Sequence, residues 1–180
     1  MAFTLQEIFP TTLKYQPMRN RYMNVAEECT NYVRRIHRSV LPNWPRELLM
    51  EWLYRHANSI EKYAFLDFES FQFELKTWNR DQLPGREAFD NEKFCDDFSG
   101  VAERAQLGDW LAIYMGREGT WNTPIVLLDN RTKRHRLPDG GPLKSPYHLL
   151  EGHRRLSYLV GLKKMRKAAL KHKVWLVSIR

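Results

Sequence analysis

The stretch that decides the fold is "YHLLEGHRRLSYLVGLKKM", residues 147–165. Its first four residues have the composition of a short strand, and Leu156, Leu159 and Val160 then recur at helical spacing. The sequence therefore predicts a strand that passes through Glu151 and Gly152 into an amphipathic helix. Gly161 is predicted to cap the C-terminus of this helix.

The strand-to-helix corner has the composition of an anion site. A helix N-terminus presents backbone N–H groups without internal partners at the positive end of the helix dipole, so it suits phosphate or carboxylate. Gly152 allows close approach to the main chain, and the side chains of Arg154 and Arg155 can bind phosphate through two parallel hydrogen bonds. We predict a phosphate site formed by Gly152, His153, Arg154 and Arg155.

The segments around this corner predict a small α+β unit. Short apolar runs separated by turns indicate strands at 109–115, 123–129, 147–150 and 173–179, with residues 131–146 as a Pro/Gly-rich loop. Four strands and one well-marked helix favour a small mixed sheet.

The first half of the chain is predicted to be mostly helical. One helix is expected at 24–39, with Asn24 as N-cap and Glu27 as its partner, and a second at 45–66, with Pro45 in its first turn. Residues 67–78 fit both a strand and a helix, and we favour the helix. A further helix is expected at 91–107. These patterns divide the chain into a helical region, 1–90, that packs on a phosphate-binding core, 91–180.

Composition limits the class of protein. With 43% hydrophobic and 13% aromatic residues among its 180, the chain has the apolar content to fold. It contains no uninterrupted apolar stretch long enough to span a bilayer, and its start lacks the pattern of a signal peptide, so a cytoplasmic protein without membrane association is expected. Cys29 and Cys95 have no partner spacing typical of a disulfide framework or a zinc site.

Positive charge is concentrated at the C-terminal end of the sequence. Residues 131–180 contain 14 Lys and Arg against 2 Asp and Glu, whereas the rest of the chain is net acidic. This asymmetry favours a polyanionic partner, nucleic acid or nucleotide phosphate, although a solvated basic face is the alternative. The candidate nucleic-acid-binding residues are Arg131, Lys133, Arg134, Arg136, Lys163, Lys164, Arg166 and Lys167. Bases could stack on Tyr147, Tyr158 or Trp175.

The pattern "PIVLLDN…YHLLEGHRRLSYLVGL…HKVWLVSI" resembles the ParB/sulfiredoxin superfamily, in which a strand leads through a GERR, GCHR or GHHR motif into a helix and a closing strand. The resemblance covers residues 109–180 and implies nucleotide-phosphate binding. Gly152 matches the motif glycine, Arg155 matches the shared arginine, and Arg154 takes the position of Arg or His. His153 matches the histidine of the free-serine kinases, so sulfinic-acid reduction, which needs a cysteine here, is not expected. Partitioning proteins read their DNA site through a helix-turn-helix domain that has no counterpart in these residues, so sequence-specific plasmid partitioning is not expected.

The resemblance also implies roles for two residues of the corner. Glu151 resembles the acidic residue of the kinase-like members, where a carboxylate positions Mg²⁺ or accepts a proton; the alternative is a surface carboxylate paired with an arginine. His153 is a candidate proton carrier or a phosphate-binding or structural histidine. Asp129, Asn130 and Asp139 lie in loops that the superfamily uses around its nucleotide, and each is also an ordinary turn residue.

Two functions remain open on the sequence alone. The first is an enzyme that binds ATP or another nucleotide, with Mg²⁺, and hydrolyses or transfers a phosphoryl group or cuts a DNA backbone, in plasmid, phage or defence biology. Small plasmid-borne members of the superfamily that inhibit conjugative transfer have this size. The second is a non-catalytic inhibitor or immunity module that binds nucleotide or nucleic acid at the corner and a protein partner through the helical first half.

Overall fold

The computed structural model describes residues 13–22 and 24–179, and the chain forms two compact units. Unit 1 contains the N-terminal residues up to Phe73 and the segment Leu137–Gly141, and unit 2 contains Glu74–Arg136 and Pro142–Ser178. The segment on which the signal-peptide argument rests lies largely outside the described residues. Within the described part of the chain, no helix is long and apolar enough to cross a membrane.

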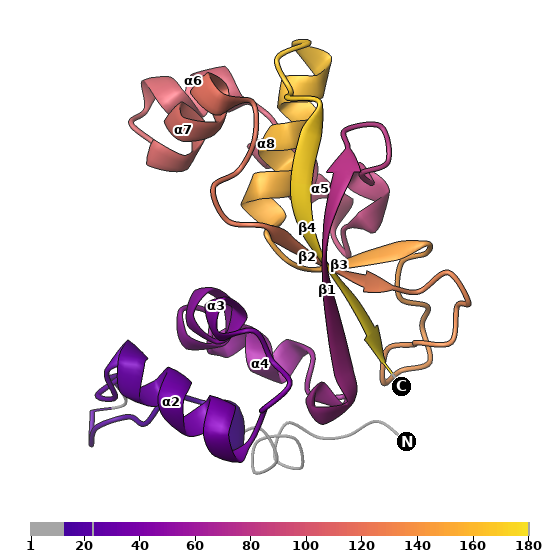
Figure 1. The fold of residues 1–180 in the computed structure, drawn as a ribbon. Coiled ribbons are helices and arrows are strands. Elements are labelled where there is room, and N and C mark those ends of the chain that lie inside the picture. Colours follow the sequence, from indigo (N-terminus) through magenta and orange to yellow (C-terminus); the bar gives the residue numbers. More distant parts are fainter. Residues whose placement is uncertain (1–12, 23, 180) are drawn as a thin grey trace. The chain divides into compact units, whose positions relative to one another are not determined.

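The sheet of this α+β fold contains strands β1 (Phe71–Asn79), β2 (Ile125–Asp129), β3 (Tyr147–Glu151) and β4 (Lys171–Ile179) in the order β1-β4-β2-β3. β2 runs antiparallel to β3 and parallel to β4, so the sheet is mixed, as predicted (Figure 1). Residues 125–128 of β2 are all buried, as expected for a central strand covered on both faces. Three of the four predicted strands are confirmed.

Helix α8 (His153–Lys164) packs on the sheet and forms much of the core of unit 2 (Figure 1). Its side chains Leu156, Leu159 and Leu162 are fully buried together with Ile125 and Leu127 of β2. The predicted helix is therefore confirmed, but its predicted end is wrong. Gly161 lies inside α8 and Met165 is the C-cap, so the basic segment 163–173 is a helix end, a turn and the start of β4.

The strand predicted for residues 109–115 is wrong. These residues form helix α7 (Trp110–Glu118), because the Asp109 carboxylate accepts hydrogen bonds from the backbone N–H groups of Leu111 and Ala112, at 3.0 and 3.2 Å. Gly119, in the left-handed conformation, ends the helix. Both capping residues can be read from the sequence. The prediction of a strand rested on the short apolar run between them, which is also compatible with a helix.

The remaining strand of the sheet, β1, was not predicted as a strand. It lies mostly within residues 67–78, for which we favoured a helix. The alternation of Phe71, Phe73 and Leu75 was therefore the correct pattern, preceded by the short 3-10 helix η3 (Phe68–Ser70) that Asp67 caps. The predicted helix 91–107 is also divided. It forms α5 (Glu92–Phe98) and α6 (Val101–Gln106), which are separated at Ser99 and Gly100; η4 (Arg86–Ala88) precedes them.

Unit 1 contains the expected helices with different boundaries. Helix α2 (Cys29–Ser39) starts five residues after Asn24, which does not cap it, and the Glu27 carboxylate instead pairs with Arg35. The single helix predicted for residues 45–66 is divided into α3 (Arg46–Leu48), the π-helix η2 (Leu49–Tyr54) and α4 (Asn58–Lys62). The 3-10 helix η1 (Leu13–Tyr15) begins the described chain.

An aromatic cluster holds unit 1 together. The buried Trp44 ring lies 4.8–5.5 Å, between ring centroids, from the rings of Trp52, Phe68, Phe71 and Phe73. Its indole N–H donates to the Phe68 carbonyl oxygen at 2.8 Å, so the polar group of the buried ring is satisfied. The predicted apolar face of residues 45–66, which includes Leu48, Leu49, Leu53 and Ile60, is fully buried.

Buried His172 predicts that the stability of unit 2 depends on pH. Its Nε2 donates to the Ala169 carbonyl oxygen at 2.9 Å and its Nδ1 lies 2.8 Å from the Thr120 hydroxyl, an arrangement that suits the neutral ring. Burial lowers the pKa of His172 from 6.5. The unfolded chain then binds more protons just below pH 6.5, so unfolding free energy should fall as pH falls through this region.

Urea unfolding at pH 7.5 and pH 5.0 measures this effect. We expect His172→Gln to unfold more easily at pH 7.5 and to lose less stability between the two pH values than the parent protein. An identical pH dependence in both proteins would show that His172 is not the responsible group.

Candidate functional site

The predicted corner is present, with β3 ending at Glu151, Gly152 in the left-handed conformation (φ 98°, ψ 27°) and α8 beginning at His153. Gly152 is buried, and a Cβ atom on it would lie 2.6 Å from Cγ2 of Ile125 on β2. Glycine is therefore required here by the backbone conformation and by packing against the neighbouring strand. No side chain of the described residues caps the N-terminus of α8.

Arg155 is bound inside the protein. Its guanidinium donates to the Glu151 carboxylate and, at 3.0 Å, to the Thr123 carbonyl oxygen, and its side chain is only 11% exposed. Glu151 and Arg155 thus form an i,i+4 ion pair that joins the end of β3 to the first turn of α8. This pair corresponds to the alternative in which Glu151 is bound to a neighbouring arginine.

Arg154 is the more accessible cation of the corner, with 44% of its side chain exposed. It donates to the Asp109 carboxylate, which also accepts a hydrogen bond of 2.5 Å from the Tyr158 hydroxyl. Burial by itself would raise the pKa of Asp109, but the hydrogen bonds from Tyr158 and Ala112 and the charge of Arg154 outweigh it and lower that pKa. Asp109 therefore links the start of α7 to α8 as an ionised carboxylate.

His153 packs against aromatic rings. Its imidazole is half-buried and lies edge-to-face with Phe89 and Phe94, at centroid distances of 5.8 and 5.9 Å. Its backbone carbonyl accepts a hydrogen bond from the Ser157 hydroxyl at 2.8 Å. The first turn of α8 is thus packed against Phe94 of α5 and against Phe89, which directly follows η4.

The loop residues considered as metal ligands have structural partners. Asp129 forms an ion pair with Arg131, and buried Asn130 holds the loop by donating to the Leu143 carbonyl oxygen at 3.2 Å. Asp139, in the segment assigned to unit 1, accepts a hydrogen bond from the Gly141 N–H. Among the residues that the structure describes, no three His, Cys, Asp or Glu side chains converge on a point that could hold a metal ion.

The two basic segments lie at different ends of unit 2. Residues 131–136 follow the end of β2, one strand length, about 17 Å, from the corner, whereas Lys163 and Lys164 lie at the far end of α8, about 18 Å from its start. Lys163 is half-buried and donates to the Leu83 carbonyl oxygen, and burial lowers its pKa. Lys164, Arg166 and Lys167 are exposed, as are Lys133 and Arg134. Arg136 is exposed as well.

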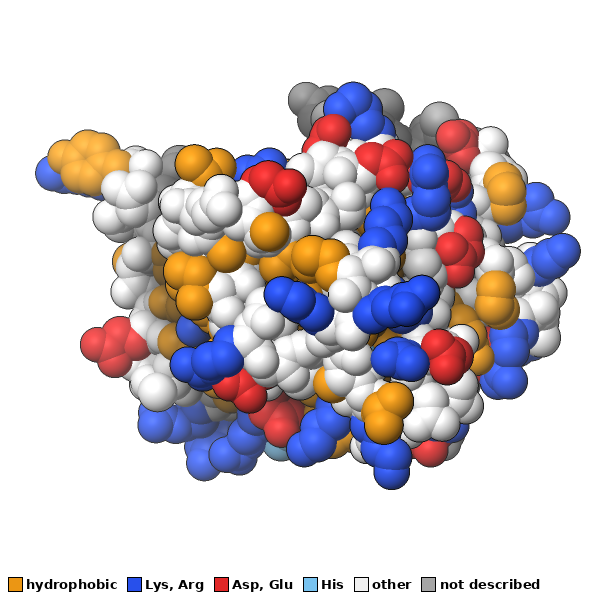
Figure 2. All heavy atoms as spheres, turned by 90° about the horizontal axis from the view of Figure 1, so that it is seen from above, with side chains coloured by type: hydrophobic (Ala, Val, Ile, Leu, Met, Phe, Trp, Pro, Cys, Tyr) orange, Lys and Arg blue, Asp and Glu red, His pale blue; other side chains and the backbone are white. Residues whose placement is uncertain are grey.

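Figure 2 shows Lys and Arg side chains scattered among acidic and hydrophobic ones on the face seen from above. Of the candidate stacking residues, Tyr158 is fully buried and Tyr147 packs on Trp78 at a centroid distance of 5.0 Å, while Trp175 is half-buried on β4. The predicted binding residues thus lie in three regions of the chain: the loop after β2, the C-terminal end of α8, and the corner between β3 and α8. Of these, only the corner, Glu151–Arg155, brings its predicted residues together in one site.

Sequence reasoning missed Asp109 as part of this site because it assigned residues 109–115 to a strand. The signal that could have found it is an aspartate directly before the apolar run 110–115, with Gly119 four residues after that run as a helix stop. Comparison with protein-family models, with curated proteins and with solved structures gives no match for this chain.

Proposed function

We propose that unit 2 is a ParB/sulfiredoxin-like module that binds the phosphate groups of a nucleotide at the N-terminus of α8 without hydrolysing them. The observation that supports this most is the start of α8 at left-handed Gly152, with no side-chain cap and with partly exposed Arg154 in its first turn. The helix dipole and the arginine both favour a phosphate there.

Binding rather than catalysis is favoured by the position of Glu151. Its carboxylate is held by Arg155 in a half-buried ion pair, which opposes its use as a base because ion pairing stabilises the ionised form. Among the described residues, no second and third His, Cys, Asp or Glu side chain converges with Glu151, so we propose no Mg²⁺ site built from protein ligands alone at the corner. Any magnesium would arrive bound to the nucleotide phosphates.

The nucleotide competes with internal carboxylates for the arginines. A phosphate must draw Arg154 from Asp109, and any contact to Arg155 requires release from Glu151. We therefore expect modest affinity that weakens as salt is added. Removing a competing carboxylate should strengthen binding, whereas removing a catalytic carboxylate should only abolish turnover.

This difference is testable by calorimetric titration with ATP and by phosphate release in Mg²⁺. We expect Glu151→Gln to bind ATP at least about threefold more tightly, and Arg154→Gln to bind about tenfold or more weakly, as for loss of a charge-assisted hydrogen bond. Lys133→Gln, an exposed charge one strand length away, serves as control. Turnover by the parent protein that Glu151→Gln abolishes would support the enzyme and contradict our proposal.

A further inference from the structure

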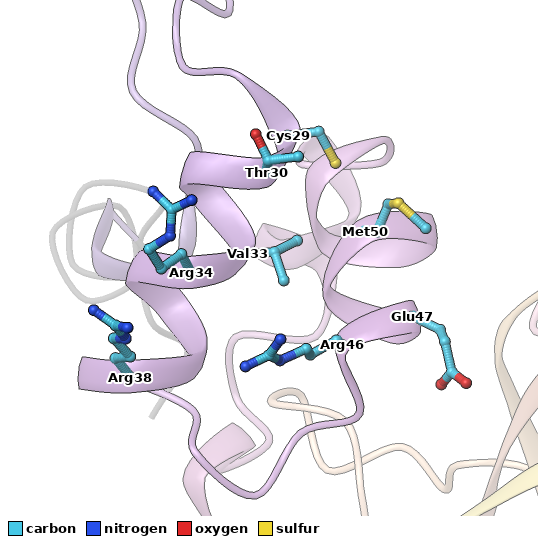
Figure 3. Close-up of a pocket in the computed structure, with 8 residues that line it drawn as sticks. All are labelled: Cys29, Thr30, Val33, Arg34, Arg38, Arg46, Glu47 and Met50. Atoms are coloured by element: carbon cyan, nitrogen blue, oxygen red, sulfur yellow. The ribbon is translucent and has the colours of Figure 1, made fainter.

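A pocket in unit 1 lies between α2 and the helical segment formed by α3 and η2, with a volume of about 480 Å³ (Figure 3). This volume is in the range of ligand sites. Val33 of α2 and Met50 of η2 supply apolar lining, and three arginines, Arg34, Arg38 and Arg46, supply its charge. We infer that this pocket binds an acidic segment of a partner protein that inserts an apolar side chain.

The arginines are available to such a partner. Arg38 and Arg46 are exposed and form no hydrogen bond or ion pair with any residue that the structure describes. Within the part of the chain that the structure describes, the Arg34 side chain donates only to the neutral amide oxygen of Asn31, at 3.1 Å. The neighbouring Arg35 behaves differently, because it is bound to the Glu27 carboxylate and to the Gln16 carbonyl oxygen.

The charged side chains that line the pocket are mainly positive. Glu47 is the one acidic residue among the described residues that line the pocket, and Figure 3 shows Glu47 directed away from the side on which Arg46 extends toward α2. Arg34 and Arg38 lie one helical turn apart, about 6 Å along α2. Carboxylates two residues apart in an extended chain have a similar separation, about 7 Å. Two acids of one segment can therefore reach the two arginines together.

The apolar lining distinguishes a protein segment from a nucleic-acid backbone. A hydrocarbon side chain seated on Val33 and Met50 gains free energy by leaving water, whereas a sugar-phosphate chain uses only the cations. The half-buried thiol of Cys29 lies at the same pocket, and burial raises its pKa. A bound segment would cover this thiol.

The experiment uses the full chain and a fluorescein-labelled peptide of sequence EDLDE. We expect saturable binding by fluorescence anisotropy, with at least tenfold weaker binding of the neutral peptide QNLNQ and clearly weaker binding of EDSDE, which lacks the apolar side chain. The double variant Arg34→Gln/Arg38→Gln should bind EDLDE at least tenfold more weakly. The double variant Lys164→Gln/Lys167→Gln removes the same charge from exposed lysines that do not line the pocket and should bind normally.

A second readout locates the peptide. Cys29 should react with a maleimide in the folded protein, whereas Cys95 is fully buried, and bound EDLDE should slow this reaction several-fold. Equal binding of EDLDE and QNLNQ, equal binding by the two double variants, or displacement of EDLDE by short double-stranded DNA that binds more tightly would overturn the inference.

Discussion

Gly152→Ala should destabilise unit 2 by about 3 kcal/mol. About 1–2 kcal/mol comes from placing a Cβ atom in the left-handed conformation, and the rest comes from its overlap with Ile125 on β2. Because Ile125 is fully buried on a central strand, it has little freedom to move aside. Urea unfolding followed by circular dichroism measures the loss, and hydrogen exchange of the β2 amides assigns it to unit 2.

Gly108→Ala provides the matched control for this change. Gly108 has a similar φ of 82°, but a Cβ atom on it would meet no heavy atom within 4 Å. We expect this variant to lose only the conformational part, about 1–2 kcal/mol. Equal losses in the two variants would show that contact with Ile125 does not explain the glycine at the corner.

Gly161→Ala should also destabilise unit 2, by about 2 kcal/mol, although alanine normally stabilises the interior of a helix. The gain in helix propensity is about 1 kcal/mol. It is outweighed because a Cβ atom at position 161 would overlap the backbone carbonyl of Ser99, which cannot rotate away as a side chain can. The glycine allows the turn between α5 and α6 to pack closely on α8.

Gly116→Ala tests the same substitution without the overlap. Gly116 lies inside α7, and its Cβ atom would make an ordinary contact with Val101 at 3.9 Å. Here we expect a stabilisation of up to about 1 kcal/mol. Opposite signs for the two variants in urea unfolding support the close contact at Ser99, and a stabilised Gly161→Ala variant would contradict it.

Strong local signals predicted the centre of unit 2 correctly. The run "IVLLD", the corner at Gly152 and the apolar face of α8 each satisfy one pattern only, and all three occur where the sequence places them. The apolar face of residues 45–66 was predicted for the same reason. The α+β class followed from these elements, although one of the four strands was assigned to the wrong segment.

The errors arose where two local patterns compete or where a distant contact decides. Residues 67–78 fit both periods, and the strand is selected by burial of Phe71 and by packing of half-buried Phe73 against Trp44. Gly161 has the residue type of a helix cap, but it is a glycine because Ser99, far away in sequence, lies against it. The Glu151–Arg155 pair was one of the alternatives that the sequence left open. The contacts of Arg154 with Asp109 and of Arg155 with the Thr123 carbonyl oxygen were not predicted, since these groups are far apart in sequence and meet only in the folded chain.

The most direct test of nucleotide binding at the corner is a titration of ¹⁵N-labelled protein with ATP, followed through the backbone amide resonances. Our proposal predicts that ATP shifts the amide resonances of Gly152, His153, Arg154 and Arg155 in a saturable way. In the folded Arg154→Gln variant, saturation should require a higher ATP concentration. Unshifted amides at these four positions with millimolar ATP, or shifts confined to the basic residues 163–167, would contradict it.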